Sequence, residues 1–239
     1  MEQPAADADV LVACRDLRKH FQVRGRAIRV LEGIDLAVRG GQIVVVTGKT
    51  GSGKSTLLGL LGGLDRPSSG EVWLEGRRVD HLAGAEWSAI RRRKIGILFQ
   101  NFNLLPSWTA RENVEAAMLH TDMARSARRE RAQALLSAVG LEDRADHLPS
   151  ELSIGQQQLV AIARAIANEP SVLLADEPTG DVDPAVASEI VSRLARPVKT
   201  QGAALFVVTH GPYPLDQADQ AFRLENGTLQ PVESAPAGS

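Results

Sequence analysis

A glycine-rich segment between an apolar strand and a helix constrains this chain more than any other feature. The apolar run Ile43–Thr47 comes directly before the segment, and a helical pattern over residues 55–64 follows it. The segment fits the pattern G-x-x-x-x-G-K-[ST], whose glycines let backbone N–H groups converge on an anion at the positive end of the helix. The sequence therefore predicts a phosphate-binding loop. It consists of Gly48, Lys49, Thr50, Gly51, Ser52, Gly53, Lys54 and Ser55, and Thr56 continues into the helix.

Two side chains at the end of this loop indicate a nucleotide bound with a divalent cation. Lys54 would neutralise the β- and γ-phosphates, and the Ser55 hydroxyl would ligate Mg²⁺. The alternative is a glycine-rich strand–helix turn without a ligand, which has no need of the lysine and the hydroxyl together. We therefore expect the loop to bind a nucleotide.

Two adjacent carboxylates follow a second apolar run, at residues 172–175. Asp176 and Glu177 would lie at the carboxyl end of a parallel strand, where the ligands of α/β sheets bind. Asp176 would hold Mg²⁺ through its water shell, and Glu177 would polarise the attacking water as general base. Such a pair by itself is more often the start of a solvated loop. Together with the phosphate-binding loop, it favours the catalytic interpretation.

Short apolar runs that alternate with helical patterns predict an α/β fold with a parallel sheet and crossover helices. Two more strands are expected at residues 95–99 and 205–209, and three more helices at residues 128–139, 155–167 and 184–194.

The flanking segments predict antiparallel structure. Strand-like alternation over residues 11–38 and 71–79 indicates a small antiparallel sheet beside the main one. Near the end of the chain, the turn Glu225-Asn226-Gly227 indicates a hairpin. We expect one domain with a helical insertion between a disordered N-terminus and a disordered tail, at residues 11–232 (insertion about 108–167), 1–10 and 233–239 respectively.

Composition narrows the class of protein. A formal charge of −2 in 239 residues gives no overall attraction to nucleic acid, so no nucleic acid partner is expected. The single cysteine, Cys14, cannot form a disulfide within the chain, so nothing indicates an oxidising compartment. Residues 1–10 lack the pattern of a secretory signal. No apolar run reaches the length of about 20 residues that a membrane-spanning helix needs. We expect a cytoplasmic location, with any membrane association through a partner.

With these features the chain resembles the ATP-binding subunits of ABC transporters, over about residues 11–229. The decisive segment is Leu152-Ser153-Ile154-Gly155-Gln156, which looks like the family's LSGGQ signature. The resemblance implies an ABC ATPase fold of the P-loop NTPase type, with a parallel-sheet core, an antiparallel β subdomain and a helical subdomain. It also implies that the chain binds ATP with Mg²⁺ and hydrolyses it to ADP and phosphate.

The resemblance assigns four further residues. Gln100 would place an amide near the metal and the water, and His210 would bond the γ-phosphate and orient the water. Phe21 would stack on adenine, although it could equally be a core residue. Asp183 belongs to the family's D-loop.

In the family, the signature of one subunit closes over the nucleotide held by another. Ser153, Gly155 and Gln156 would thus complete the nucleotide site of a second copy of this chain, because a helix N-terminus favours a γ-phosphate. The sequence departs from the family pattern at Ile154, in place of a glycine, and at Leu159, where many relatives have arginine. A left-handed backbone at Ile154 would cost about 1–2 kcal/mol. We expect ordinary helix-start geometry there instead, and an active ATPase.

The chain also resembles the branch with lipoprotein-releasing, macrolide-export and antimicrobial-peptide transporters, through residues 100–106, 109–114 and 176–180. Apolar residues in the region Asn101–Trp108 would either form a pocket for a permease helix or pack inside the helical insertion. The basic clusters at residues 91–94 and 125–131 indicate solvated helix faces, with lipid headgroups as the alternative.

The expected function is to couple ATP-driven dimer closure to a conformational change in a membrane permease. The chain would act on the cytoplasmic side of the membrane, in an exporter or a lipoprotein or peptide system. One alternative is an ABC ATPase that regulates a membrane protein without moving a solute. Another is a soluble ABC ATPase that acts on nucleic acid or ribosomes, which the single cassette without a long coiled-coil insertion disfavours.

Overall fold

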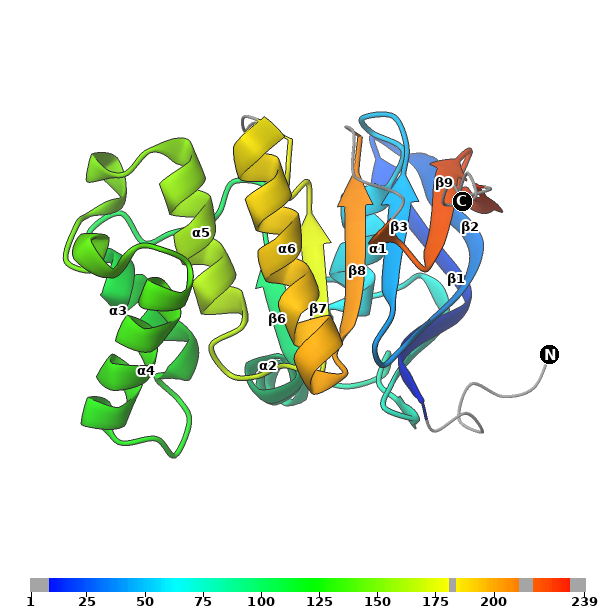
Figure 1. Cartoon of the computed structure of the whole chain (residues 1–239). Coiled ribbons are helices and arrows are strands. Elements are labelled where there is room, and N and C mark those ends of the chain that lie inside the picture. Colours follow the sequence, from blue (N-terminus) through cyan, green and yellow to red (C-terminus); the bar gives the residue numbers. More distant parts are fainter. Residues whose placement is uncertain (1–8, 181–183, 211–216, 233–239) are drawn as a thin grey trace.

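The computed structural model describes residues 9–180, 184–210 and 217–232. Its centre is a six-stranded sheet in the order β10-β9-β3-β8-β7-β6 (Figure 1). The strands from β9 to β6 are parallel, and β10 pairs antiparallel with β9 in the predicted hairpin. The bounds are β3 Ile43–Thr47, β6 Ile95–Leu98, β7 Val172–Asp176, β8 Ala204–Thr209, β9 Gln220–Glu225 and β10 Thr228–Pro231.

The parallel strands are buried on both faces, because alternate side chains enter two separate cores. Val45 and Val207 pack in one core, which helices α5 (Ile154–Ala165) and α6 (Pro184–Gln201) cover. Val44 and Phe206, their neighbours along the strands, pack in the other core, behind which α1 (Lys54–Leu61) lies (Figure 1). This arrangement brings the carboxyl ends of β3, β7 and β8 to one edge of the sheet.

A second sheet is antiparallel, as the alternation predicted, in the order β2-β1-β4-β5. Its strand β1 begins at Val10, one residue earlier than the expected domain boundary. Helix α2 follows this sheet, and only its last four residues, 91–94, were expected to be helical. The bounds are β1 Val10–Val23, β2 Arg26–Arg39, β4 Ser69–Leu74, β5 Arg77–Arg78 and α2 Gly84–Lys94.

Helices gather beyond β6 at one end of the parallel sheet (Figure 1). They pack around buried residues such as Met118, Leu136 and Ile162. Helix α6 continues seven residues beyond the predicted end, with Pro197 inside it. None of the helices in the described ranges is long and apolar enough to cross a bilayer. The remaining bounds are α3 Ala110–Glu115, η2 Ala116–Met118, α4 Arg125–Ala138, η3 Glu142–Arg144 and η4 Pro149–Glu151.

Candidate functional site

The predicted phosphate-binding loop connects β3 to α1, and its glycines have the backbone that the turn requires. Gly51 has φ 80° and Gly53 has φ 104°, both in the left-handed region that side chains disfavour. Gly53 caps α1 and lies against β2, where an added Cβ would meet Val30 Cγ1 at 2.8 Å. The loop therefore curls over the N-terminus of α1, the end that favours anions.

Lys54 is the buried cation of the loop, with only 6% of the residue exposed. Its Nζ donates to the carbonyls of Gly48 at 2.9 Å and Lys49 at 3.2 Å. The same atom lies 3.7 Å from Oε1 of Glu177. The structure thus brings together the loop lysine and the carboxylate that the sequence assigned to general-base catalysis.

Glu177 and His210 meet across the ends of β7 and β8. Oε2 of Glu177 accepts a hydrogen bond from the backbone N–H of His210 at 2.9 Å, and Oε1 lies 2.8 Å from the ring Nδ1. Glu177 has φ 51°, and its backbone N–H donates to the Val208 carbonyl at 2.8 Å. This left-handed turn is costly for a non-glycine residue and directs the carboxylate toward Lys54 and His210.

Asp176 is buried beside this pair, and its Oδ1 has no hydrogen-bond partner among the described residues. Burial raises the pKa of Asp176 above its usual value, and the negative charge of Glu177 adds to the rise. A hydrogen bond from Ser55 and the charge of Lys54 oppose it. A buried carboxylate oxygen without a partner, next to a hydroxyl, is suited to a hard cation.

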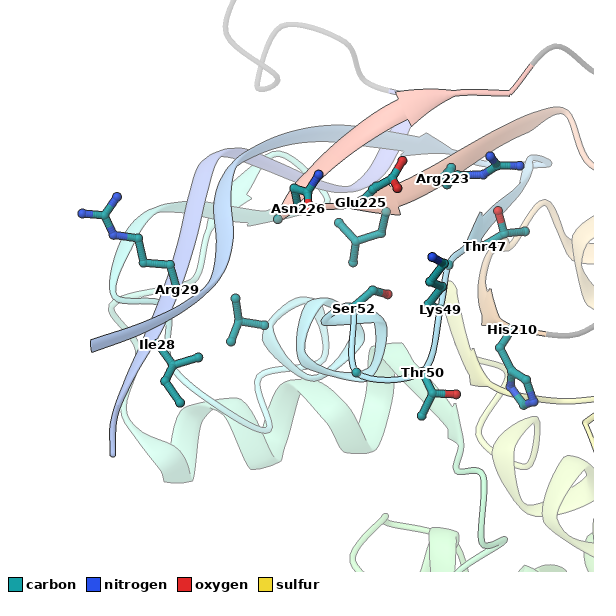
Figure 2. Close-up of a pocket in the computed structure, with 15 residues that line it drawn as sticks. Ile28, Arg29, Thr47, Lys49, Thr50, Ser52, His210, Arg223, Glu225 and Asn226 are labelled. Atoms are coloured by element: carbon teal, nitrogen blue, oxygen red, sulfur yellow. The ribbon is translucent and has the colours of Figure 1, made fainter. Parts of the chain in front are cut away.

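A cavity of about 660 Å³ lies over the loop (Figure 2). Gly48, Lys49, Thr50, Gly51 and Ser52 line it on one side, with His210 beside them. The other walls come from β2, from the end of β3 and from the C-terminal hairpin, and the sequence did not assign the hairpin to the site. The lining residues of these walls are Ile28, Arg29, Val30, Thr47, Arg223, Leu224, Glu225, Asn226 and Gly227.

Phe21 and Gln100 lie outside the described lining of this cavity. Phe21 is 39% exposed on β1, with Lys19 Nζ 4.8 Å from its ring centroid. It pairs in register with Ile28, which does line the cavity, so adenine stacking at Phe21 stays a prediction. Gln100 is exposed just after β6, and its metal and water contacts also stay predictions.

The signature segment forms the N-terminus of α5. Ser153 caps the helix by accepting from the backbone N–H of Gln156 at 3.2 Å, and the Gln156 side chain accepts from the Ser153 N–H at 3.0 Å. Ile154 begins the helix without a positive φ and is 56% exposed, so the expected helix-start geometry is confirmed. Gly155 follows in the helix, and Leu159 is buried in the core. Asp183 lies outside the described residues.

Helix α5 also reaches the catalytic turn by a contact that the sequence did not reveal. The side chain of Gln158, which is buried, donates to the carbonyl of Pro178, the residue after Glu177. A glutamine in a helical pattern carries no signal for such a contact. The signature helix and the general-base candidate are therefore physically connected within one chain.

In the region Asn101–Trp108, some apolar side chains pack inside the protein and others are exposed, so each of the two alternatives, internal packing and a permease contact, holds for part of it. Phe102 and Leu104 are half-buried against the core, whereas Leu105 is 41% exposed. Asn113, which is fully buried, holds the loop by donating to the carbonyls of Leu105 at 3.1 Å and Trp108 at 2.9 Å. The loop is thus a fixed surface with an exposed apolar tip.

Comparison with known proteins identifies the family. The ABC transporter family matches residues 31–180. The chain is 43% identical to the lipoprotein-releasing system ATP-binding protein LolD of Nitrobacter hamburgensis, over 95% of this chain and 97% of that protein. It is also 43% identical to the macrolide export ATP-binding/permease protein MacB of Brucella melitensis, over 92% of this chain but only 34% of that protein.

A solved structure shares the fold. It is a dimeric ATP-binding cassette, MJ0796, in a post-hydrolysis state with ADP and Pi, at 37% identity and a TM-score of 0.87. The likeness covers 92% of this chain and 97% of that one. The chain therefore belongs to the ABC transporter family and is an ATP-binding and ATP-hydrolysing subunit of a transporter.

Proposed function

We propose that two copies of this chain enclose two Mg-ATP molecules between them and that their closure drives a conformational change in a membrane permease. Each copy would supply its phosphate-binding loop to one nucleotide and its signature helix to the other. The chain would lie at the cytoplasmic face of the membrane, held there by the permease, in an exporter or a lipoprotein-releasing system.

One observation carries the proposal of a shared site. Among the described residues that line the cavity over the loop, none belongs to the signature segment Ser153–Gln156. Yet the N-terminus of α5 leaves the backbone N–H groups of Ile154 and Gly155 for an anion, because the capping bonds use those of Ser153 and Gln156. The two halves of a phosphate site thus lie in separate places on one chain, and a second copy would join them.

Mg²⁺ fits the residues near the loop. No group of three or more His, Cys, Asp or Glu side chains in the described ranges could hold a metal by itself. Mg²⁺ needs no such group, since one or two protein oxygens with phosphates and waters suffice. Ser55 would be such an oxygen. Oδ1 of Asp176, which has no hydrogen-bond partner in the part of the chain that the structure describes, would hold the ion through its water shell, and Gln100 would approach from the end of β6. When bound, the ion would neutralise charge that develops on the phosphates.

The residues of this chain would divide the hydrolytic work. Lys54 would exchange its bonds to the loop carbonyls for phosphate oxygens. Glu177 would take the proton of the attacking water, held in orientation by the two contacts from His210. Because a carboxylate only accepts hydrogen bonds, Nδ1 of His210 carries a proton in this contact. In the neutral ring this leaves Nε2 as an acceptor, so donation from Nε2 to a γ-phosphate would need a proton on both ring nitrogens.

The relatives support the assembly. MJ0796 is a dimer in its solved structure, and MacB is named as an ATP-binding and permease protein in one chain. The present chain spans a third of MacB, which leaves a permease as the part it would need from a partner. The loop at Asn101–Trp108, with Leu105 exposed, is the surface proposed for that contact.

Mixing two inactive variants tests the shared site. Lys54→Ala removes the loop cation, and Gly155→Asp places a negative charge at the signature where a phosphate would bind. Asp in the first turn suits a helix, so folding should persist. Each variant alone should hydrolyse little ATP, whereas an equal mixture should recover roughly a quarter of wild-type activity, because half the dimers hold one intact site of two. A mixture no more active than its components would contradict the proposal.

A further inference from the structure

The amide of Gln158 on α5 is a buried polar group that bonds outside its own helix. Only 2% of the residue is exposed, and the apolar residues from Leu159 to Ala163 continue the buried part of the helix after it. Its Nε2 donates to the carbonyl of Pro178, whereas its Oε1 has no hydrogen-bond partner among the described residues. A buried amide oxygen without a partner costs free energy that an apolar side chain of the same size would avoid. Packing alone therefore does not explain a glutamine at this position.

The two glutamines that precede Gln158 bond to the residues at the start of α5. The side chain of Gln156 accepts from the backbone N–H of Ser153 at 3.0 Å, and that of Gln157 donates to the carbonyl of Leu152 at 3.1 Å. These bonds fix the beginning of the helix. The bond from Gln158 instead joins α5 to the catalytic turn after β7, 20 residues further along the chain. Its position in the fold therefore connects it with the general-base candidate.

The catalytic turn needs a contact of this kind because its own backbone bonds hold it weakly. Glu177 has φ 51°, a conformation that a non-glycine residue keeps only where surrounding contacts impose it. The N–H of Glu177 donates to the Val208 carbonyl at 2.8 Å. On the other side Pro178 has no N–H, and the N–H of Gly180 reaches the Glu177 carbonyl only at 3.3 Å. The ring of Pro178 fixes φ, so the direction of its carbonyl depends on ψ, and the hydrogen bond from Gln158 fixes that direction.

We propose that Gln158 is a positioning residue for Glu177. By holding the Pro178 carbonyl, it keeps the left-handed turn that aims the carboxylate at Lys54 and His210, 3.7 and 2.8 Å away. Gln158 is not among the described residues that line the cavity over the loop, so it acts through the glutamate. The inference rests on the proposed function, in which Glu177 takes the proton of the attacking water. Misplacing such a group by about 1 Å lowers turnover about 100-fold.

Gln158→Met removes the donor with little change of shape, because methionine is unbranched and of similar size. We expect kcat to fall about 10- to 100-fold, while the Kd for ATP, measured with a fluorescent analogue, stays within about threefold of wild type. The melting temperature should stay within about 5 °C of wild type. Gln157→Met is the matched control, because it removes the bond at the start of α5 and should leave kcat within about threefold. Gln158→Asn keeps the amide but shortens its reach, and it makes the same comparison if the methionine variant does not fold.

Mixed chains test whether Gln158 acts on the glutamate of its own chain. In the mixture of Lys54→Ala and Gly155→Asp, the intact site takes its signature from the Lys54→Ala chain. It takes its loop from the Gly155→Asp chain, together with the Glu177 that lies beside that loop. Adding Gln158→Met to the Gly155→Asp chain should lower the recovered activity about 10- to 100-fold. Adding it to the Lys54→Ala chain should leave the recovered activity within about threefold, although the same substitution is present.

The inference is overturned if kcat of Gln158→Met stays within about threefold of wild type, or if the Kd for ATP rises as much as kcat falls. Equal losses of kcat in Gln158→Met and Gln157→Met would overturn it too, and so would equal losses in the two mixtures. If the mixture of Lys54→Ala and Gly155→Asp recovers no activity even without a change at Gln158, the proposed shared site fails instead. The kcat and Kd of the single variants then still decide the role of Gln158.

Discussion

His210 Nδ1 lies 2.8 Å from Oε1 of Glu177, and the backbone N–H of the same histidine donates to Oε2 at 2.9 Å. The glutamate is almost fully buried, whereas the histidine side chain is 46% exposed and lines the nucleotide cavity. One residue therefore fixes both oxygens of the general-base candidate from the side that faces the cavity. The two residues directly follow the neighbouring parallel strands β7 and β8, so the pairing of these strands places them side by side.

Removing the imidazole should separate hydrolysis from binding. In His210→Ala the backbone bond to Glu177 remains, but the ring contact and any γ-phosphate contact are lost. We expect kcat to fall by about 10²–10³-fold, the range for losing a positioned acid–base or charge-stabilising group. The Kd for ATP, measured by titration with a fluorescent analogue, should change by less than about threefold. Equal losses in binding and in turnover would contradict this role.

The two left-handed glycines of the loop should respond differently to alanine. Both changes incur the left-handed backbone cost of about 1–2 kcal/mol. Gly53→Ala adds a collision at 2.8 Å with Val30, which costs roughly 1–3 kcal/mol more, whereas a Cβ at Gly51 meets nothing within 4 Å. Thermal unfolding should therefore show a larger loss of stability for Gly53→Ala. Equal melting temperatures of the two variants would show that Val30 of β2 does not restrict the space at position 53.

Asp176 should destabilise the fold when it is ionised. Its folded-state pKa is raised above the usual 3.8, so its stabilising contribution is present below that value and is lost as the pH rises through the raised pKa. Asp176→Asn should therefore melt higher than wild type at pH 7, by about 2–4 °C for each kcal/mol gained. The difference should shrink as the pH falls and the wild-type carboxyl takes up its proton.

The same variant should lose Mg²⁺-dependent hydrolysis, since an amide is a poorer ligand for this cation than a carboxylate. An Asp176→Asn chain that melts lower than wild type at pH 7 would show that the carboxylate is held by favourable contacts instead.

Replacing Ile154 with the glycine of the family pattern should change the free energy of unfolding in a direction that shows whether isoleucine is strained there. Ile154 starts α5 in ordinary helical geometry, so Ile154→Gly should lower the free energy of unfolding by a few tenths to about 1 kcal/mol through helix propensity. A strained isoleucine would give the opposite sign. The wild-type chain with its permease should also hydrolyse ATP well above the rate of Lys54→Ala, and parity between them would show that isoleucine inactivates the signature.

The elements that the sequence predicted best are those whose signal is local. The strand Ile43–Thr47 is a short apolar run bounded by turns, and the structure has it with the same bounds. The first part of helix α2, before residue 91, was missed because only Trp87 of the helix is buried, so the segment shows no apolar stripe. Helix α6 was ended too early, at residue 194, because the hydrophobic pattern alone does not show that packing carries it past Pro197.

In the candidate site too, the parts formed by contiguous residues could be predicted and the parts formed by distant segments could not. The loop from Gly48 to Ser55 and the Asp176–Glu177 pair could be located because each motif is contiguous. The hairpin wall of the cavity could not, since it depends on β9 pairing with β3, which sets Arg223 opposite Thr47.

The central claim is that ATP joins two copies of this chain. Glu177→Gln should block hydrolysis while keeping the shape of the site, so its mass by light scattering after gel filtration tests the claim most directly. With Mg-ATP the account predicts twice the chain mass of 25.6 kDa, and without nucleotide, or with an added Lys54→Ala change, it predicts the single mass. A Glu177→Gln chain that binds ATP yet keeps the single mass at saturating nucleotide would contradict the account.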